Sequence, residues 1–389
     1  MNPSALDTPS LDRAVMELRE SAGSWSATPL TRRIALLERL LPRVASGSAE
    51  LAAVGARAKG YAPHSPWAAE DWSGGPWALA QNAAAYLHVL RRIAGGEEPV
   101  DPRAVCEEDG RTKVGVFPAA GWDRLLLNGF TGQVWMCPGI TAEQVRDRAA
   151  GEYRGRPGRP AVALVLGAGN VAAITALDVL HKLYVEGQVV IAKLNPVNTY
   201  LRPHFERVFA EFVARGWVRF VDGGAAEGGY LARHEVIDAI HVTGSDQTHD
   251  AIVWGTDEDA EQRRRDDQPL VTKPFSSELG GVSPCIVAPG PWSDADFRFQ
   301  AEHIVTGKTN NSGHNCIASQ VLVCRVTGTV PSGCWARSGG CCASCLRAPI
   351  TTPAPPGAWP PFSPPTRRRR PTATAARFSS PTSPTTTTS

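Results

Sequence analysis

Two residues in one stretch of the chain have the types needed for covalent chemistry on a carbonyl group. Cys316 ends the polar turn Asn311-Ser312-Gly313-His314-Asn315-Cys316, and Glu278 precedes Leu279-Gly280-Gly281. A cysteine thiolate attacks a carbonyl carbon, and a nearby base and backbone N–H groups help to form and hold that anion. Both residues also have structural readings, because a lone cysteine often packs as a small hydrophobic residue and a glutamate before glycines often marks a strand-to-turn junction. The upstream sequence favours the chemical reading.

The elements that would position these residues alternate between strand and helix. The apolar run 161–166 is typical of a strand buried on both faces of a parallel sheet. Further strands are predicted at 188–192, 217–221 and 237–242, with helices at 171–185, 203–214, 223–234 and 247–255. This alternation predicts an α/β fold with an open, doubly wound parallel sheet.

Four polar or small residues lie at the ends of these predicted strands. Lys193, Asn170, Gly224 and Ser245 all fall at or just after the carboxyl end of a strand. Open α/β sheets bind ligands at that edge, so the pattern predicts a nucleotide site. Each residue has an alternative reading: Lys193 as a solvated charge, and Gly244-Ser245 as a helix N-cap. The same helix start would equally receive a pyrophosphate.

The turn after the first buried strand is a weak dinucleotide signal by itself. It reads Gly167-Ala168-Gly169-Asn170, but Ala172 stands where a G-x-G-x-x-G fingerprint has its last glycine.

Before the sheet, the chain has a helical part and two short strands. Residues 10–58 are predicted as helices, with Pro42 kinking or ending the second, and 78–93 as another helix. We expect these helices to form an outer layer without chemistry of its own. The segments 112–118 and 133–137 have short β character.

Composition excludes some functions and leaves others open. The formal charge of the 389 residues is +2, but the last 65 carry eight Arg and no acid, so the remainder has 32 basic and 38 acidic residues. A weakly acidic body does not indicate nucleic-acid binding. No apolar run is long enough to span a bilayer, and no secretion signal is evident at the start. Scattered cysteines without paired metal-ligand spacing fit reduced thiols, so we expect no metal site and a cytoplasmic location.

The sequence changes character at about residue 325. From there to residue 389 it holds twelve Pro, twelve Thr and the run Arg367-Arg368-Arg369-Arg370, without apolar periodicity. Such a composition predicts disorder. Cys341, Cys342 and Cys345 lack the paired second half of a metal knuckle. We therefore divide the chain into three parts. Residues 1–281 form a helical layer with a coenzyme-binding α/β domain, residues 282–324 form an incomplete catalytic domain, and residues 325–389 form a low-complexity tail.

With these pieces in order, residues 11–324 resemble the aldehyde dehydrogenase superfamily. The resemblance rests on five features in sequence: Asn170, Lys193, Thr243-Gly244-Ser245, Glu278-Leu279-Gly280-Gly281 and Gly313-x-x-Cys316. It implies that Cys316 is the nucleophile, forming a thiohemiacetal and then a thioester. The Asn170 amide and the Cys316 N–H would form the oxyanion hole, and Glu278 would activate the hydrolytic water.

The resemblance also implies a nicotinamide cofactor, NAD or NADP. Lys193 would contact the adenosine ribose, and Ser245 with Gly244 would lie at the pyrophosphate. Leu279 would border the nicotinamide through its backbone. Gly224 and Gly228 would let the adenine end approach the backbone.

Departures from the family pattern leave several points open. Three residues after Lys193, Pro196 replaces the glutamate that often grips the ribose hydroxyls, so NADP is as plausible as NAD. Glycines replace the usual aromatic residues before Asn170, and His314 stands where Gln is common. Nothing after residue 324 matches the family's remaining catalytic and oligomerisation segments, which suggests truncation or a shifted reading frame. The substrate would be a small-molecule aldehyde, and the homo-oligomer interface typical of the family would be incomplete.

Three functions follow from these observations. The leading prediction is NAD(P)-dependent oxidation of an aldehyde to a carboxylic acid. The second is a truncated, non-catalytic nucleotide-binding fragment. The third is a coenzyme A-linked acyl reductase of the same superfamily, which Glu278 disfavours because a retained water-activating base favours hydrolysis.

Overall fold

The centre of the fold is a five-stranded parallel sheet, which confirms the predicted α/β class. The structure is a computed structural model that describes residues 7–119, 121–155, 158–288 and 290–324. The strand order is β6-β5-β4-β7-β8, and neighbouring strands pair in parallel. The strands are β4 (Val162–Leu166), β5 (Val189–Lys193), β6 (Val218–Val221), β7 (Ala239–Gly244) and β8 (Phe275–Leu279).

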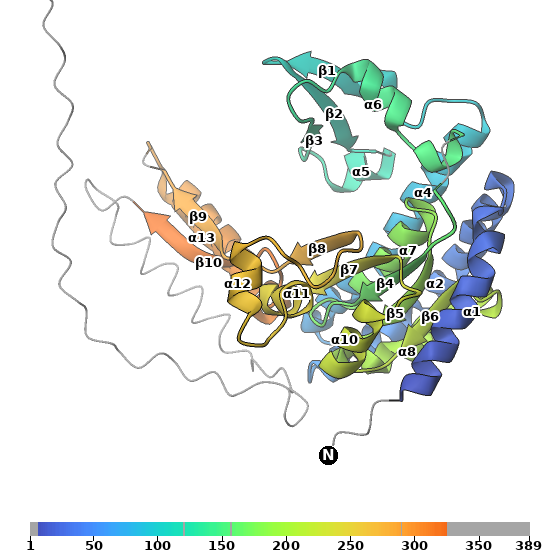
Figure 1. Cartoon of the computed structure of the whole chain (residues 1–389). Coiled ribbons are helices and arrows are strands. Elements are labelled where there is room, and N and C mark those ends of the chain that lie inside the picture. The colour runs from blue at the N-terminus through green and yellow to red at the C-terminus, as the bar shows by residue number, and fades with distance from the viewer. Residues whose placement is uncertain (1–6, 120, 156–157, 289, 325–389) are drawn as a thin grey trace, which may run out of the picture. The chain divides into compact units, whose positions relative to one another are not determined.

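This order places a topological switch point at the central strand. The chain runs from β4 outward through β5 to β6 and then returns to β7 on the other side of β4 (Figure 1). Register pairs Leu166 of β4 with Lys193 of β5 and with Val242 of β7, so the carboxyl ends of the strands meet at one edge. Ligands of doubly wound sheets bind at such a point.

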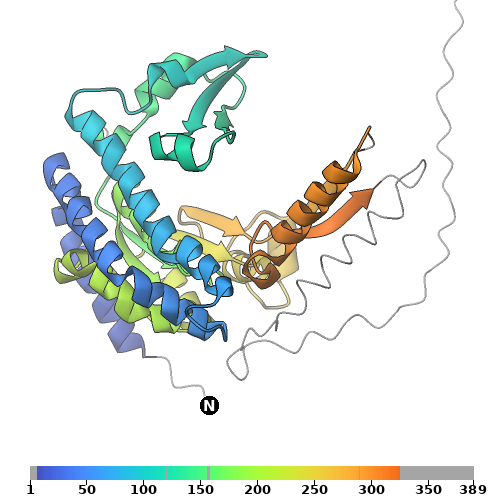
Figure 2. The same cartoon turned by 180° about the vertical axis from the view of Figure 1, so that it is seen from behind.

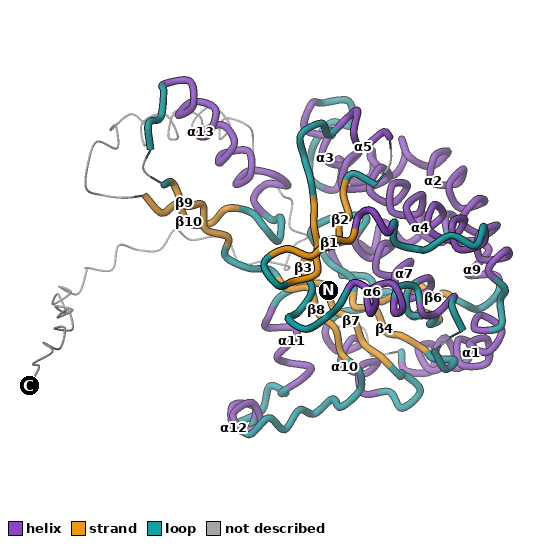
Figure 3. Tube along the Cα trace, turned by 90° about the horizontal axis from the view of Figure 1, so that it is seen from above, coloured by secondary structure: helices purple, strands orange, loops and turns teal. Residues whose placement is uncertain are grey.

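Helices enclose the sheet because its strands are apolar on both faces; every residue of β4 and β5 is buried. Figure 3 shows α7 and α4 on one side of the central strands and α10 on the other. The longer helices are α1 (Thr8–Ser26), α2 (Leu30–Ala58), α4 (Ala78–Ala94), α7 (Ile174–Tyr184), α10 (Ala225–Arg233) and α11 (Asp246–Val253). Shorter ones are α3 (Ala69–Trp72), α8 (Arg202–Val208), α9 (Ala210–Ala214) and α12 (Ala260–Arg265). None of the helices within the described ranges is long and apolar enough to cross a membrane.

Two smaller sheets accompany the main one. Strands β1 (Val105–Glu108), β2 (Arg111–Phe117) and β3 (Gly132–Trp135) pair antiparallel, with α5 (Gly121–Leu126) and α6 (Ala142–Arg148) beside them in sequence. Strands β9 (Ser283–Val287) and β10 (Ser319–Cys324) pair in parallel and are connected through α13 (Asp294–Thr309). Figure 2, seen from behind, shows α13 alongside the β9–β10 pair.

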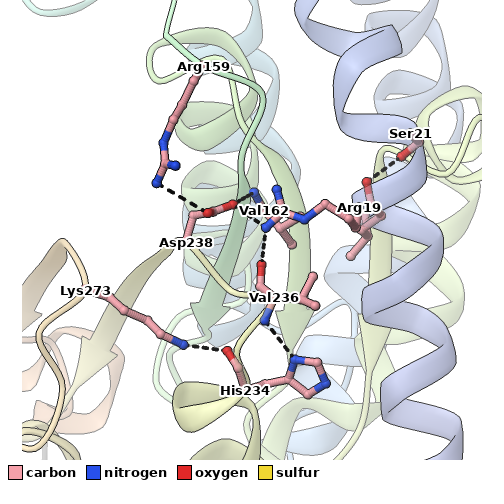
Figure 4. A network of polar contacts seen from close by, with 9 residues as sticks. Arg19, Ser21, Arg159, Val162, His234, Val236, Asp238 and Lys273 are labelled. Atoms are coloured by element: carbon pink, nitrogen blue, oxygen red, sulfur yellow. Dashed lines mark hydrogen bonds and ion pairs between the residues drawn. The ribbon is translucent and has the colours of Figure 1, made fainter.

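A network around Asp238 ties the amino ends of the strands to α1. Its carboxylate accepts hydrogen bonds from the Val162 backbone N–H (2.8 Å) and from Arg19 (2.7 Å). Arg19 also donates to the Val236 carbonyl, and the Lys273 ammonium donates to the His234 carbonyl (Figure 4). The network therefore joins α1 to the starts of β4 and β7.

Most predicted elements are present, with shifted ends. Pro42 lies inside α2 and does not end it, since that helix continues to Ala58. The helix predicted at 203–214 is two helices, because Phe209 has a non-helical backbone (φ −90°, ψ 18°). Strands β1, β8, β9 and β10 and the short helices α3, α5, α6 and α12 were not predicted. The tail from residue 325, with its predicted disorder and its cysteines, lies outside the described residues.

Candidate active site

The turn after β4 is built from glycines because other chain segments approach it closely. A Cβ atom on Gly167 would lie 2.2 Å from the Thr175 hydroxyl oxygen, and one on Gly169 would lie 2.8 Å from the Asn195 side chain. The buried Asn198 amide also donates to the Ala168 carbonyl at 3.0 Å. The sequence Gly167-Ala168-Gly169 is therefore needed for packing, and it fixes where Asn170 begins.

Lys193 ends β5 as a buried cation. Its side-chain ammonium donates to the Gly223 carbonyl at 2.9 Å, and only 7% of the residue is exposed. Burial lowers the pKa of Lys193 to about 8, and the carboxylates of Glu227 and Asp222 oppose that shift. A desolvated cation at the carboxyl edge of the sheet is suited to an anionic ligand. The reading of Lys193 as a solvated surface charge is wrong.

The glycines after β6 serve the start of α10 and the side chain of Lys193. The Gly224 N–H donates to the Glu227 carboxylate at 2.7 Å, closing the first turn of α10. A Cβ atom on Gly228 would lie 3.6 Å from Lys193 Cε, an ordinary contact distance. Gly228 therefore lies directly against the stem of Lys193.

Ser245 caps α11, and Leu279 continues the sheet beside it. The Ser245 hydroxyl accepts from the Thr248 N–H at 3.1 Å, which confirms the predicted N-cap. Gly244 pairs with Leu279, and its carbonyl accepts from the Gly280 N–H at 3.0 Å. The α11 N-terminus and the end of β8 are thus adjacent at the carboxyl edge, where the N–H groups of a helix start attract anions.

The turn that carries Cys316 has an unusual backbone. Asn311, Ser312 and Gly313 have φ values of 52°, 55° and 79°. A left-handed conformation costs non-glycine residues about 1–2 kcal/mol each, so Asn311 and Ser312 need support from their surroundings. Such strain is common where a protein positions reactive groups.

Hydrogen bonds connect this turn to Asn170 and to the segment after Glu278. The Asn170 amide donates to the His314 carbonyl (2.8 Å), and the Asn311 amide donates to the Asn170 carbonyl (2.7 Å). The Gly281 N–H approaches the Cys316 carbonyl at 3.4 Å, three residues after Glu278. The structure therefore brings together the segments that carry the three predicted catalytic residues. One N–H of the Asn170 side-chain amide is already used in the hydrogen bond to the His314 carbonyl.

The side chains of Cys316 and Glu278 are both exposed. The Cys316 thiol lies 3.7 Å from the Asn315 side-chain oxygen, and Glu278 is on β8 opposite Thr243 of β7. A thiol open to solvent is accessible to a substrate.

The outer helical layer contributes side chains that the sequence did not single out. The Glu70 carboxylate accepts from the Asn311 N–H at 2.9 Å, and the Tyr61 hydroxyl lies 2.9 Å from that of Ser312. Burial raises the pKa of Glu70, opposed by the Asn311 N–H and by Lys59. The layer that was expected to have no chemistry of its own therefore contacts the turn that carries Cys316. The sequence signal was an acidic pair, Glu70-Asp71, in a Trp-rich segment.

A small polar pocket lies between that layer and the turn. It is lined by Lys59, Glu70, Asp71, Ser73, Gly74, Val171, Ala172, Asn310, Asn311 and Asn315. Lys59 pairs with Asp71 at 3.0 Å within it. Across the described ranges, no group of three or more His, Cys, Asp or Glu side chains is arranged to hold a metal ion.

Comparison with known proteins finds a family match over part of the chain. Residues 162–327 match the model of the aldehyde dehydrogenase family. The chain is 31% identical over 156 residues to an NADP-dependent glyceraldehyde-3-phosphate dehydrogenase of Scenedesmus vacuolatus, covering 40% of this chain and 59% of that protein. It is 24% identical over 163 residues to the dimeric NADP-preferring aldehyde dehydrogenase of Mus musculus, covering 42% of this chain and 32% of that protein. The matched region thus spans about a third to three fifths of these relatives.

Solved structures share the fold. An aldehyde dehydrogenase from Bartonella henselae superposes with a TM-score of 0.58 at 13% identity, over 87% of this chain and 56% of that one. Aldehyde dehydrogenase C from Pseudomonas syringae, solved with NAD+ and octanal, gives 0.55 at 18% identity, over 86% and 54%. Taken together, the family match assigns residues 162–327 to the aldehyde dehydrogenase family, and the solved structures show that the chain shares the fold of these enzymes.

Proposed function

We propose that the chain carries the catalytic residues of an NAD(P)-dependent aldehyde dehydrogenase, which oxidises an aldehyde to a carboxylic acid. Cys316 adds to the aldehyde carbonyl, and the Asn170 amide and the Cys316 N–H receive the developing negative charge. This addition gives a thiohemiacetal, and a thioester remains on Cys316 once hydride has left the substrate carbon for the bound nicotinamide. A water that Glu278 deprotonates then hydrolyses the thioester. The observation that carries this proposal is the pair of links from the Cys316 turn, one to Asn170 and one to Gly281.

The carboxyl edge of the sheet has groups that suit a dinucleotide. Lys193 offers a buried cation, and the N-terminus of α11 at Ser245 offers N–H groups to a phosphate. Leu279 borders the same edge, beside Gly244. When bound, the nicotinamide accepts hydride from the substrate carbon; the chain's part is to bind and orient it.

Either NAD or NADP fits these residues. Pro196 is exposed and uncharged, so no carboxylate at this position would repel a 2′-phosphate. The names of two matched relatives, NADP-dependent and NADP-preferring, favour NADP. We place the protein in the cytoplasm, on the basis of its scattered cysteines, of which Cys106, Cys137, Cys285 and Cys316 are free thiols.

The test is aldehyde-dependent reduction of NAD or NADP by the purified chain. Aliphatic aldehydes such as octanal and a phosphorylated aldehyde such as glyceraldehyde 3-phosphate should both be assayed. Cys316→Ala should abolish turnover, and Glu278→Gln should allow one burst of reduced cofactor per chain and then stop. Turnover that survives Cys316→Ala would refute the proposal.

The second candidate is a nucleotide-binding fragment without turnover. The observation in its favour is a group of exposed apolar side chains on and after α5: Trp122, Leu125, Leu126 and Phe130, each at least 68% exposed. Exposed apolar surface of this kind promotes association with other molecules. A thermal shift with NADP but no aldehyde-dependent reduction would favour this candidate. Acyl-thioester formed in place of acid when coenzyme A is present would instead favour the reductase.

A further inference from the structure

Glu70 holds the backbone of the Cys316 turn at Asn311, the first of its left-handed residues. One carboxylate oxygen accepts the Asn311 N–H at 2.9 Å, and the other lies 3.4 Å from the Asn310 amide nitrogen. Asn311 is the first left-handed residue of the turn and is 9% exposed, so water has little access to replace this contact. A buried N–H without a partner is unfavourable, and Glu70 therefore stabilises this backbone conformation.

The same contact is coupled to Asn170. The Asn311 side chain donates to the Asn170 carbonyl at 2.7 Å, and the Asn170 side chain donates to the His314 carbonyl at 2.8 Å. The chain of contacts runs from Glu70 through Asn311 to Asn170 and back to the residue two before Cys316. Moving the Asn311 backbone would therefore move both the thiol and the amide.

A second contact from the helical layer acts on the next residue. The Tyr61 hydroxyl lies 2.9 Å from the Ser312 hydroxyl. Lys59 and Asp71 form an ion pair at 3.0 Å and line the same pocket as Glu70.

We propose that Glu70 is a positioning residue: it holds the left-handed Asn311–Ser312 turn so that the Cys316 thiol and the Asn170 amide face one carbonyl-sized gap. Glu70 touches neither substrate nor cofactor in this role and acts through Asn311. The proposal rests on the proposed function for its catalytic consequence, but its structural part can be tested without turnover.

Three substitutions of Glu70 separate the effect of side-chain length from the effect of the negative charge. Glu70→Gln keeps an oxygen that can accept from Asn311 and loses the charge, whereas Glu70→Asp keeps the charge and loses about one methylene of reach. Glu70→Ala removes both. Glu38→Ala is the matched control, because Glu38 forms an exposed ion pair with Arg91 in the same helical layer and does not contact the turn.

Backbone hydrogen exchange measured on peptides gives a direct readout. In Glu70→Ala and Glu70→Asp, we expect exchange in residues 309–318 to be about tenfold faster, with peptides of β4 and β5 unchanged. Glu70→Gln and Glu38→Ala should match the parent. In turnover, kcat should fall about tenfold with KM nearly constant for Ala and Asp, and Gln should restore it.

Parent-like exchange in a folded Glu70→Ala protein would overturn the proposal. So would a Glu70→Gln variant as impaired as Glu70→Ala, since charge and not reach would then matter. If Glu70→Ala does not fold, Glu70→Asp and Tyr61→Phe decide in its place, because each weakens one contact of the turn. A parent chain that oxidises no aldehyde would defeat the proposed function, while the exchange measurements would still decide the role of Glu70.

Discussion

The two edges of the five-stranded sheet use polar groups differently. At the amino edge, Asp238 binds the Val162 N–H and Arg19, and these contacts connect strand starts to α1. At the carboxyl edge, Lys193 is buried with a lowered pKa, and Asn311 and Ser312 are held in left-handed conformations. The amino edge thus gains stability from its polar groups, whereas the carboxyl edge keeps groups in states that cost stability. That contrast is typical of a ligand site at the ends of parallel strands.

The largest effect on stability is expected at the amino edge. Asp238→Ala leaves the Val162 N–H without its acceptor and removes the ion pair with Arg19. We expect a loss of about 3 kcal/mol in the free energy of unfolding. Urea denaturation measures it. Asp222→Ala is the control, since it removes an exposed ion pair with Arg202 and should cost about 0.5 kcal/mol. Equal losses in the two variants would contradict the contrast between the edges.

The tight turn after β4 should be almost as sensitive. Gly167→Ala places a methyl group 2.2 Å from the Thr175 hydroxyl oxygen; Thr175 lies in the first turn of α7 and is buried, so it has little room to move. We expect a loss of about 2 kcal/mol. Gly23→Ala, in the last turn of α1 with no atom within 4 Å of the new methyl, should instead gain about 0.5–1 kcal/mol from helix propensity. A neutral Gly167→Ala would show that the turn tolerates a side chain.

The sequence predicted the sheet better than it predicted the support of the active-site turn. Strands such as Val162–Leu166 are apolar throughout, and their order follows from local pattern and general connection rules. The positions of Lys193, Gly244 and Ser245 at strand ends followed from the same reasoning, because a residue's place along a strand fixes its edge.

The contacts of Glu70 and Tyr61 could not be predicted in this way. They join residues 241 and 251 positions apart in sequence, and no local period carries that information. Likewise, neither the split at Phe209 nor the passage of α2 through Pro42 follows from residue pattern, because tertiary packing overrides helix propensity at both points.

The burial of the Lys193 charge at the carboxyl edge should make the free energy of unfolding depend on pH. Its folded-state pKa is about 8 against 10.5 in an unfolded chain, so the folded protein must hold a buried charge below pH 8. The contribution of this residue to stability therefore rises as the pH increases from about 8 to 10.5. Lys193→Met removes the charge, and we expect a gain of about 1–2 kcal/mol at pH 7 that shrinks toward pH 10.

The same substitution should weaken cofactor binding under the proposed function. Loss of the cation is expected to raise the Kd for NAD or NADP about tenfold, measured by calorimetry at pH 7. If the carboxyl edge keeps a destabilising charge for ligand binding, the Lys193→Met variant should be more stable than the parent and should bind the cofactor more weakly. A Lys193→Met variant that is less stable than the parent at pH 7 would instead place Lys193 among the stabilising groups.

The smallest effect should appear at Pro196, three residues beyond Lys193. Under the proposed function, a carboxylate at position 196 lies near the 2′-phosphate of bound NADP. Repulsion between like charges should then lower the preference for NADP over NAD about fivefold. Pro196→Glu is compared with Pro196→Gln, which has the same shape without the charge and shows any effect of losing the proline at the start of its short helix. The ratio of kcat/KM for the two cofactors is the measurement, made at low and high salt because an exposed charge is screened. Equal ratios in the Glu and Gln variants would mean that the cofactor's ribose lies away from Pro196, and the carboxyl edge would then discriminate between cofactors by other residues.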